Sequence, residues 1–370
     1  MDGCGMAERD STGHFGGLDG LRGVAAMAVA ANHAYRLLGF QLLAHGYMAV
    51  DFFFILSGFV ISHAYQERLR GGMTLGRFVQ ARVDRLYPMV ILGVGAGALA
   101  LVLGLGFEWS AVLPAAVLQV LLLPAPFLHA YDDFIWPLNP PAWSLFWEVL
   151  ASLAFGLGLF RLGNRVLAGI FLGFALWLGA AALRWSTVEV GYVAANALEG
   201  LPRTAVSFTL GMLIWRGCKA GLLDRLRNRP APALWLVAAL LMAVFLIPGR
   251  SGYVDMLLIL VILPGLLLAG VLCGAASGVW NWAGRISYPL YLVHFPILFA
   301  IEPFVRPDMS AVERGLWFAG YLLAALVGGW LAAVCWDEPV RRALRRWRKA
   351  RAAAPGGGVP APEVPVPLGR

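Results

Sequence analysis

Long apolar stretches recur along the whole chain, and they decide what it can fold into. Ten of them are long enough, at about 20 residues, to cross the hydrocarbon core of a bilayer as helices. They fall at residues 22–40, 47–64, 88–106, 142–160, 167–184, 201–217, 232–248, 254–273, 286–305 and 313–336. Only 14% of the 370 residues are charged, against about a quarter in an ordinary soluble domain. The sequence therefore predicts an all-α, polytopic transmembrane helical bundle.

A shorter apolar stretch at residues 110–123 contains Pro114, and it suits a re-entrant or interfacial helix better than a crossing. The distribution of positive charge agrees. With ten spans and a cytoplasmic N-terminus, 23 of the 29 Lys and Arg residues fall in segments that face the cytoplasm. An eleventh span would place the basic segments 161–165 and 216–229 outside. We therefore predict ten spans with both termini cytoplasmic.

We divide the chain into a flexible N-terminal tail at residues 1–17, one membrane domain at 18–345 and a C-terminal tail at 346–370. The C-terminal tail is basic at first and then rich in Pro and Gly, which predicts disorder. The basic run 341–349 is suited to anchoring on anionic lipid heads. Four scattered cysteines show no metal-ligand spacing, and the chain has neither a P-loop nor a folded basic module. We expect no metal site and no nucleic-acid partner.

Ionisable side chains inside or beside apolar spans are costly, so they are candidates for function. Arg22 begins the first span, and Arg82 and Arg85 stand just before the third, all at the predicted cytoplasmic face. Three guanidinium groups at one membrane surface can grip phosphate oxygens with paired hydrogen bonds. The alternative is that they only orient the protein, as positive residues in cytoplasmic loops do.

Two histidines, His33 and His294, fall well inside apolar spans. His33 follows Arg22 by eleven residues, which is about 16 Å along a helix, or half the hydrocarbon thickness. A neutral imidazole there can accept a hydroxyl proton as a general base. Glu148, at the outer start of the fourth span, would fix the tautomer of His33 if their helices pack together. The alternatives are a helix–helix hydrogen bond for either histidine and a solvated rim position for Glu148.

Asp51, near the start of the second span, is a second candidate carboxylate, and the tripeptide Ser57-Gly58-Phe59 follows it in the same span. A serine nucleophile on a strand-to-helix elbow needs the GxSxG context, which is missing here. Gly58 is better suited to a close approach of two helices, with Ser57 bonding backbone or ligand.

Six motifs follow one another in the chain. They are Arg22-(ten residues)-His33, VDFFFILSGFVIS (50–62), ARVDRLYP (81–88), WSLFWE (143–148), ISYPLYLVHFP (286–296) and DEPVRR (337–342). In type and order they resemble the motif set of the acyltransferase-3 family of integral-membrane O-acyltransferases, over about residues 17–345. The chain departs from that set at Phe146 and Trp147, in the variable part of the fourth motif. No extracytoplasmic esterase domain follows, so we expect no relay of the acyl group to a second catalytic domain on this chain.

The resemblance implies an enzyme of a bacterial plasma (inner) membrane that moves an acyl group, usually acetyl, from cytoplasmic acyl-CoA to a hydroxyl. The acceptor would be an extracytoplasmic or membrane-linked glycan, and acyl-CoA would be a co-substrate, with no permanently bound cofactor. His33 matches the essential histidine of the family, and with Glu148 it forms the expected catalytic pair. We expect donor binding by Arg22, Arg82, Arg85, Ser57, Gly58 and Phe59. We expect acceptor or tunnel lining by Asp51, Trp143, Tyr291 and His294.

Two other functions stay open on the sequence alone. One is a transporter or flippase for a lipid-linked glycan, although mid-membrane carboxylates that would carry protons are few. The other is a scaffold subunit of an envelope complex. Within the acyltransferase class, the acceptor can also be a secreted small molecule such as a macrolide. Loops 107–141 and 185–200 are the expected acceptor-binding segments, but their residues name no acceptor, and the sequence leaves acyl length and oligomeric state open.

Overall fold

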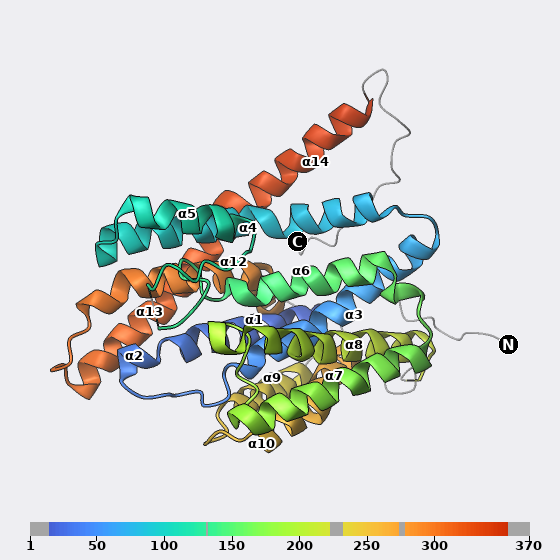
Figure 1. Cartoon of the computed structure of the whole chain (residues 1–370), viewed down its shortest axis with the longest axis horizontal. Helices are drawn as coiled ribbons and strands as arrows, with labels where there is room; N and C mark the ends of the chain where they lie inside the picture. Colours follow the sequence, from blue (N-terminus) through green and yellow to red (C-terminus); the bar gives the residue numbers. More distant parts are fainter. Residues whose placement is uncertain (1–14, 131, 223–231, 274–277, 354–370) are drawn as a thin grey trace.

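The computed structural model describes residues 15–130, 132–222, 232–273 and 278–353. Within these ranges the chain is a bundle of helices without strands, and it has an isolated bridge between Phe134 and Val193. Most of the helices lie side by side along one axis (Figure 1). Six stretches of helix are long and apolar enough to cross a membrane. The predicted polytopic helical bundle is therefore confirmed, while the number of spans and the side of the termini stay predictions.

The helices of the bundle follow the predicted spans. The six long apolar ones are α3 (Met48–Arg70), α4 (Leu75–Leu105), α7 (Asn164–Trp185), α10 with α11 (Gly252–Leu257 and Leu263–Leu272, joined by the π-helical Leu258–Ile262), α12 (Gly278–Ile301) and α13 (Ala311–Leu331). Four further helices correspond to the remaining predicted spans: α1 (Gly16–His33), α6 (Ala142–Leu157), α8 (Gly200–Lys219) and α9 (Pro232–Phe245).

The first span differs from its predicted bounds of 22–40. Helix α1 begins earlier and ends at His33, and a separate short helix, α2 (Tyr35–Leu38), follows it. Close packing explains the early start. A Cβ on Gly17 would lie 2.4 Å from a backbone oxygen of α11, and one on Gly23 would lie 2.5 Å from the Cβ of Ala283 in α12. His33 is therefore the last residue of a helix, and residues 16–17, assigned to the tail from sequence, belong to its first turn.

The stretch at 110–123 forms α5 (Trp109–Val120), a helix of 12 residues with Pro114 inside. A helix of this length measures about 18 Å, which is too short for a hydrocarbon core of about 30 Å. The helix packs against α4 (Figure 1). The structure thus confirms the prediction of a short helix at this position.

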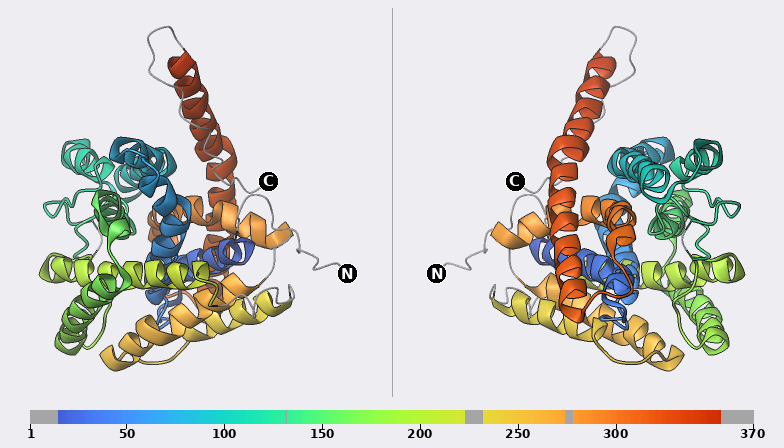
Figure 2. Two further views of the ribbon diagram at one scale, coloured as in Figure 1. Left: turned by 90° about the vertical axis from the view of Figure 1, so that its right-hand side faces the viewer. Right: turned by 90° about the vertical axis from the view of Figure 1, so that its left-hand side faces the viewer.

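Helix α14 (Glu338–Ala353) leaves the bundle and projects from it (Figure 2). A π-helical segment, Ala332–Asp337, joins it to α13. Arg348 of α14 bonds Asp84 of α4 at 2.6 Å, which ties the projecting helix back to the bundle. The helix includes residues 346–353, which the sequence assigned to the tail, and the Pro/Gly-rich part of that tail lies outside the described residues.

Two glycines set the contact between α3 and α8. A Cβ on Gly58 would lie 2.0 Å from the carbonyl oxygen of Phe208, and one on Gly211 would lie 2.0 Å from that of Ile55. Because no side chain fits at either position, the two backbones touch. The predicted packing role of Gly58 is confirmed.

Gly58→Ala should destabilise the protein, because the added methyl group has to push α3 and α8 apart. Overpacking of this kind typically costs about 1–3 kcal/mol. Thermal unfolding of the detergent-purified protein measures the effect. Gly95→Ala is the matched control, since a Cβ on Gly95 of α4 meets nothing within 4 Å. Equal unfolding midpoints for the two variants would contradict the close contact.

Candidate functional site

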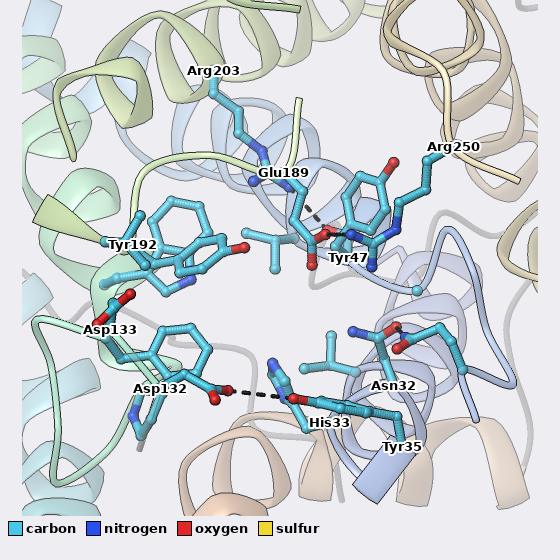
Figure 3. Close-up of a pocket in the computed structure, with 18 of the residues that line it drawn as sticks. Asn32, His33, Tyr35, Tyr47, Asp132, Asp133, Glu189, Tyr192, Arg203 and Arg250 are labelled. Carbon is cyan, nitrogen blue, oxygen red and sulfur yellow. Dashed lines mark hydrogen bonds and ion pairs between the residues drawn. The ribbon is translucent and has the colours of Figure 1, made fainter. Parts of the chain in front are cut away.

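A pocket of about 410 Å³ lies where α1 ends and two loops return to the bundle. His33 faces its interior from the end of α1, beside Asn32 (Figure 3). The pocket is lined by both of the loops to which the sequence analysis assigned acceptor binding. The loop after α5 contributes Asp132, Asp133 and Phe134, and the loop after α7 contributes Glu189, Tyr192 and Val193.

His33 is held by a second histidine. Its Nδ1 lies 3.0 Å from Nε2 of His294, and the planes of the two rings are 9° apart. His294 is fully buried in α12, and its Nδ1 lies 3.2 Å from the carbonyl oxygen of Leu290. His294 was expected among the lining residues, but it stands behind His33, outside the set of described residues that line the pocket.

This pair of contacts assigns the tautomers of both rings. The Leu290 carbonyl can only accept, so Nδ1 of His294 carries the proton and its Nε2 is an acceptor. His33 therefore donates from Nδ1, and its own Nε2 keeps a free lone pair. That is the form of imidazole needed to remove a proton from a hydroxyl group in the pocket.

Asp51 stands behind the pocket wall and holds Arg203, which forms part of it. The two side chains make hydrogen bonds of 2.7–3.2 Å, and both are buried, at 0–1% exposed. Arg203 also donates to the carbonyl oxygens of Val190 and Tyr47. Asp51 was expected to line the site, but it neutralises the arginine that does so. The charged Arg203 at the end of an apolar span was a signal in the sequence, although its partner was not readable there.

A second ion pair joins Glu189 and Arg250 at the pocket wall, with 2.5 Å between carboxylate and guanidinium (Figure 3). Glu189 lies in the loop before α8, outside the membrane-spanning helices. Burial raises the pKa of its carboxyl, and the charge of Arg250 opposes that shift. The guanidinium groups of Arg203 and Arg250 thus each have a carboxylate partner.

A buried aspartate, Asp255, fixes the loop that carries Glu189. Its carboxylate accepts hydrogen bonds from the hydroxyls of Tyr47 at 2.7 Å and Thr187 at 2.9 Å, and from the amide of Val188 at 2.8 Å. Asp255 is 0% exposed and lies 3.3 Å from Nε2 of His45. Sequence analysis gave no role to Asp255, because the hydrogen-bond partners of its carboxylate lie 67 to 208 residues away in the chain.

Trp143 and Tyr291 both line the pocket, as expected from the sequence. Tyr291 shares a hydrogen bond of 2.7 Å with Ser144, and Trp143 lies under the guanidinium of Arg203, 5.2 Å from its ring centre. With Tyr47 and Tyr192 they give the pocket an aromatic wall.

Glu148 is not beside His33. It accepts hydrogen bonds from Arg82 at 2.7 Å and from Ser57 at 2.8 Å. Glu148 lies five residues beyond Trp143 in α6, which is about 7.5 Å farther along that helix. The expected pairing of Glu148 with His33 is therefore wrong. The hydroxyl of Ser57 is thus a hydrogen-bond donor to Glu148.

The three predicted donor-site arginines do gather at one place, and we call Arg22, Arg82 and Arg85 the arginine cluster. Arg22 donates to the Ser287 hydroxyl and to the Gly284 carbonyl, both at 2.7 Å, and pairs with Asp19 at 3.1 Å. The guanidinium of Arg85 lies 5.3 Å from the ring centre of Tyr288. Of the remaining predicted donor residues, Gly58 packs against α8, and Phe59 is buried with its ring edge against Phe15.

Three helices link the pocket with the arginine cluster. Each carries one residue at the pocket and one at the cluster, which are His33 and Arg22 on α1, Trp143 and Glu148 on α6, and Tyr291 and Tyr288 on α12. None of the three arginines is among the described residues that line the pocket. The two places are therefore separate, and the same helices fix the distance between them.

Comparison with known proteins identifies the family. The family model described as an acyltransferase domain matches residues 15–334. The chain belongs to the acyltransferase-3 family. It is therefore a membrane acyltransferase, as its motifs indicated.

Two known proteins are similar to this chain, and one of them is named as an acyltransferase. Acyltransferase MdmB of Streptomyces mycarofaciens is 28% identical over 390 aligned positions, which cover 91% of this chain and 94% of that protein. Protein 2 in picA locus of Rhizobium radiobacter is 39% identical over 152 residues, or 37% of this chain and 78% of that protein. No solved structure gives a significant match.

Asp51→Asn should destabilise the protein strongly, because it leaves the buried charge of Arg203 without its counter-charge. Breaking a buried pair in this way costs about 3–5 kcal/mol. Asp308→Asn is the control, since Asp308 pairs with Arg306 at 3.6 Å with both side chains largely exposed. Thermal unfolding in detergent should show a large fall in midpoint for the first variant only. The same midpoint in both would show that the Asp51–Arg203 pair does not support the pocket wall.

Proposed function

We propose that this acyltransferase moves an acetyl group from cytoplasmic acyl-CoA to a hydroxyl of a glycan on the far side of, or linked to, a bacterial plasma membrane. One observation carries the proposal. An imidazole with a free Nε2, fixed by His294 at 3.0 Å, faces a pocket large enough for a sugar-sized group. Membership of the acyltransferase-3 family supplies the reaction class, and the arginine cluster supplies a place for the phosphates of the donor.

In this scheme His33 is the general base. Its Nε2 takes the proton of the acceptor hydroxyl while the hydroxyl oxygen attacks the thioester carbonyl carbon. As the tetrahedral intermediate collapses, the carbon–sulfur bond breaks, and the leaving thiolate recovers the proton from the imidazolium. Nδ1 keeps its hydrogen bond to His294 throughout, which prevents the ring from turning. A base of this kind contributes about 10²–10⁴-fold to the rate.

The donor would enter from the opposite end. Guanidinium groups bind phosphate oxygens with charge-assisted hydrogen bonds, so the arginine cluster suits the phosphates of CoA. Arg22 and His33 lie eleven residues apart on one helix, about 16 Å. The pantetheine arm would run along α1 over that distance and bring the thioester to His33. Donor and acceptor then stay on opposite sides of the reacting atoms.

The composition of the pocket supports a neutral, hydroxyl-rich acceptor. Aromatic faces of Tyr47, Trp143 and Tyr192 suit the apolar faces of sugar rings, while Asn32 and Gln41 supply amide groups for hydroxyls. The two arginines of the wall are paired with carboxylates, so neither is left to bind an acidic group on the acceptor.

His33→Ala should abolish transfer of radiolabel from acetyl-CoA to the glycan fraction of membranes that express the protein. Loss of the base predicts a fall of about 10²-fold or more. His129→Ala, at an exposed loop histidine outside the pocket, should keep wild-type activity. Transfer at the wild-type rate in His33→Ala would contradict the general-base role.

Arg85→Ala should raise the KM for acetyl-CoA about tenfold or more, because a charge-assisted phosphate contact contributes about 1.5–3 kcal/mol. The KM for the acceptor should not change. Membranes that carry the native acceptor allow the measurement. Arg77→Ala is the control, since Arg77 is an exposed arginine near the start of the same helix. An unchanged KM for acetyl-CoA in Arg85→Ala would remove the phosphate role of the cluster.

A further inference from the structure

A fourth arginine reaches the arginine cluster from the far end of the chain. Arg341 lies in the first turn of α14, some 250 residues after Arg85. Its side chain is 12% exposed, and it pairs with Asp337 at 2.5 Å. Arg342, the next residue, has a side chain that is 55% exposed and lies 4.0 Å from Glu338. Helix α14 therefore carries a buried arginine, Arg341, directly before a surface arginine, Arg342.

The backbone just before Arg341 is held against α4. Residues Ala332–Asp337 are π-helical, a local widening of the helix that is frequent at functional sites. Within this segment, the indole of Trp336 donates to the carbonyl oxygen of Pro88 at 2.7 Å. Pro88 lies in α4 three residues after Arg85, so this bond pins the start of α14 beside the helix that carries Arg82 and Arg85.

Positive charge exceeds negative charge where these elements meet. The charge of Arg341 is close enough to that of Arg85 for the two to repel, and Arg22 also feels the charge of Arg85. The carboxylate of Asp337 interacts with Arg341 and Arg85 together. Arg22 and Arg82 have Asp19 and Glu148 as their salt-bridge partners. In the described part of the chain, Arg22, Arg82 and Arg341 each have a carboxylate within ion-pair distance, and Arg85 has none.

Hydrogen bonding in this region is also incomplete. Nε of Arg82, Nε of Arg341 and Oδ1 of Asp337 are buried and have no hydrogen-bond partner among the described residues. Buried donors without acceptors are costly, and repulsion between guanidinium groups adds to that cost. A bound anion would accept hydrogen bonds from the two arginine Nε groups and supply negative charge, whereas Oδ1 of Asp337 needs a donor instead.

We propose that Arg341 binds a phosphate group of the acyl-CoA donor, so that the donor site is closed by the C-terminal helix as well as by α1 and α4. The proposal rests on the proposed function, and it assigns a role to the start of α14 that differs from lipid anchoring. An anionic lipid head would bind along the exposed face of the helix, where Arg342 lies. A donor phosphate binds at the buried face, where Arg341 lies.

The test is the affinity of the detergent-purified full chain for CoA, measured by calorimetry. Arg341→Gln should bind CoA about 10–100-fold more weakly than the wild type, as expected for loss of a charged hydrogen bond. Arg342→Gln should bind CoA like the wild type. Arg341→Lys keeps the charge and a partner for Asp337, so it should fold normally and bind with intermediate affinity.

The outcomes separate this proposal from the proposed function. Wild-type affinity in Arg341→Gln, or an equal loss in Arg342→Gln, overturns the role of Arg341 while leaving the donor site itself standing. Failure of the wild-type protein to bind CoA overturns the proposed function instead. If Arg341→Gln does not fold, Arg341→Lys decides, because wild-type affinity in that folded variant would contradict a paired hydrogen bond from the guanidinium to phosphate.

Discussion

The contact between α1 and α12 sets the geometry of both functional regions. Glycines allow the two helices to touch, since a Cβ on Gly23 or Gly284 would lie 2.5 Å from an atom of the opposite helix. At one end of this contact Arg22 bonds the backbone and a hydroxyl of α12, and at the other end His33 bonds His294. A sideways shift of either helix would break both sets of bonds. The imidazole of His33 and the guanidinium of Arg22 are therefore positioned by a single packing interface.

Under the proposed function, this arrangement would let one enzyme join substrates from two sides of a membrane. The pocket is built mainly from helix ends and loops, which give it polar and aromatic groups. The arginine cluster is built from side chains on α1 and α4, with partners on α6 and α12. Neither the pocket nor the arginine cluster has to move for the other to bind its ligand.

The sequence revealed many residues of the site but few of the side chains that they contact. Apolar periodicity and charge placed most helices correctly, and the same charge reasoning singled out His33, Asp51 and the arginines. Which side chains meet depends on helix rotation and depth, and these are not encoded in a single apolar run. Glu148 was placed beside His33 because both lie in outer halves of predicted spans, but it bonds Arg82 and Ser57.

The end of α1 was also beyond prediction, for a related reason. Hydropathy continues past His33 through Leu37 and Leu38, so it predicted a span to residue 40. The structure breaks the helix at Ala34, where ψ is 15°. The partnership of Asp51 with Arg203 and the anchoring of the pocket loop by Asp255 depend on contacts across 152 and 67 residues of chain, which only the fold reveals.

The central claim is that a thioester reaches a fixed imidazole from a cationic site about 16 Å away along the same helix. The most direct test is an experimental structure of the protein with a non-hydrolysable acetyl-CoA analogue. We predict that the phosphates lie at the arginine cluster. The acyl carbonyl carbon should lie within about 3.5 Å of the place that the acceptor hydroxyl oxygen takes when it donates to Nε2 of His33. An analogue bound with its acyl group away from His33, or with its phosphates away from the arginines, would contradict the account.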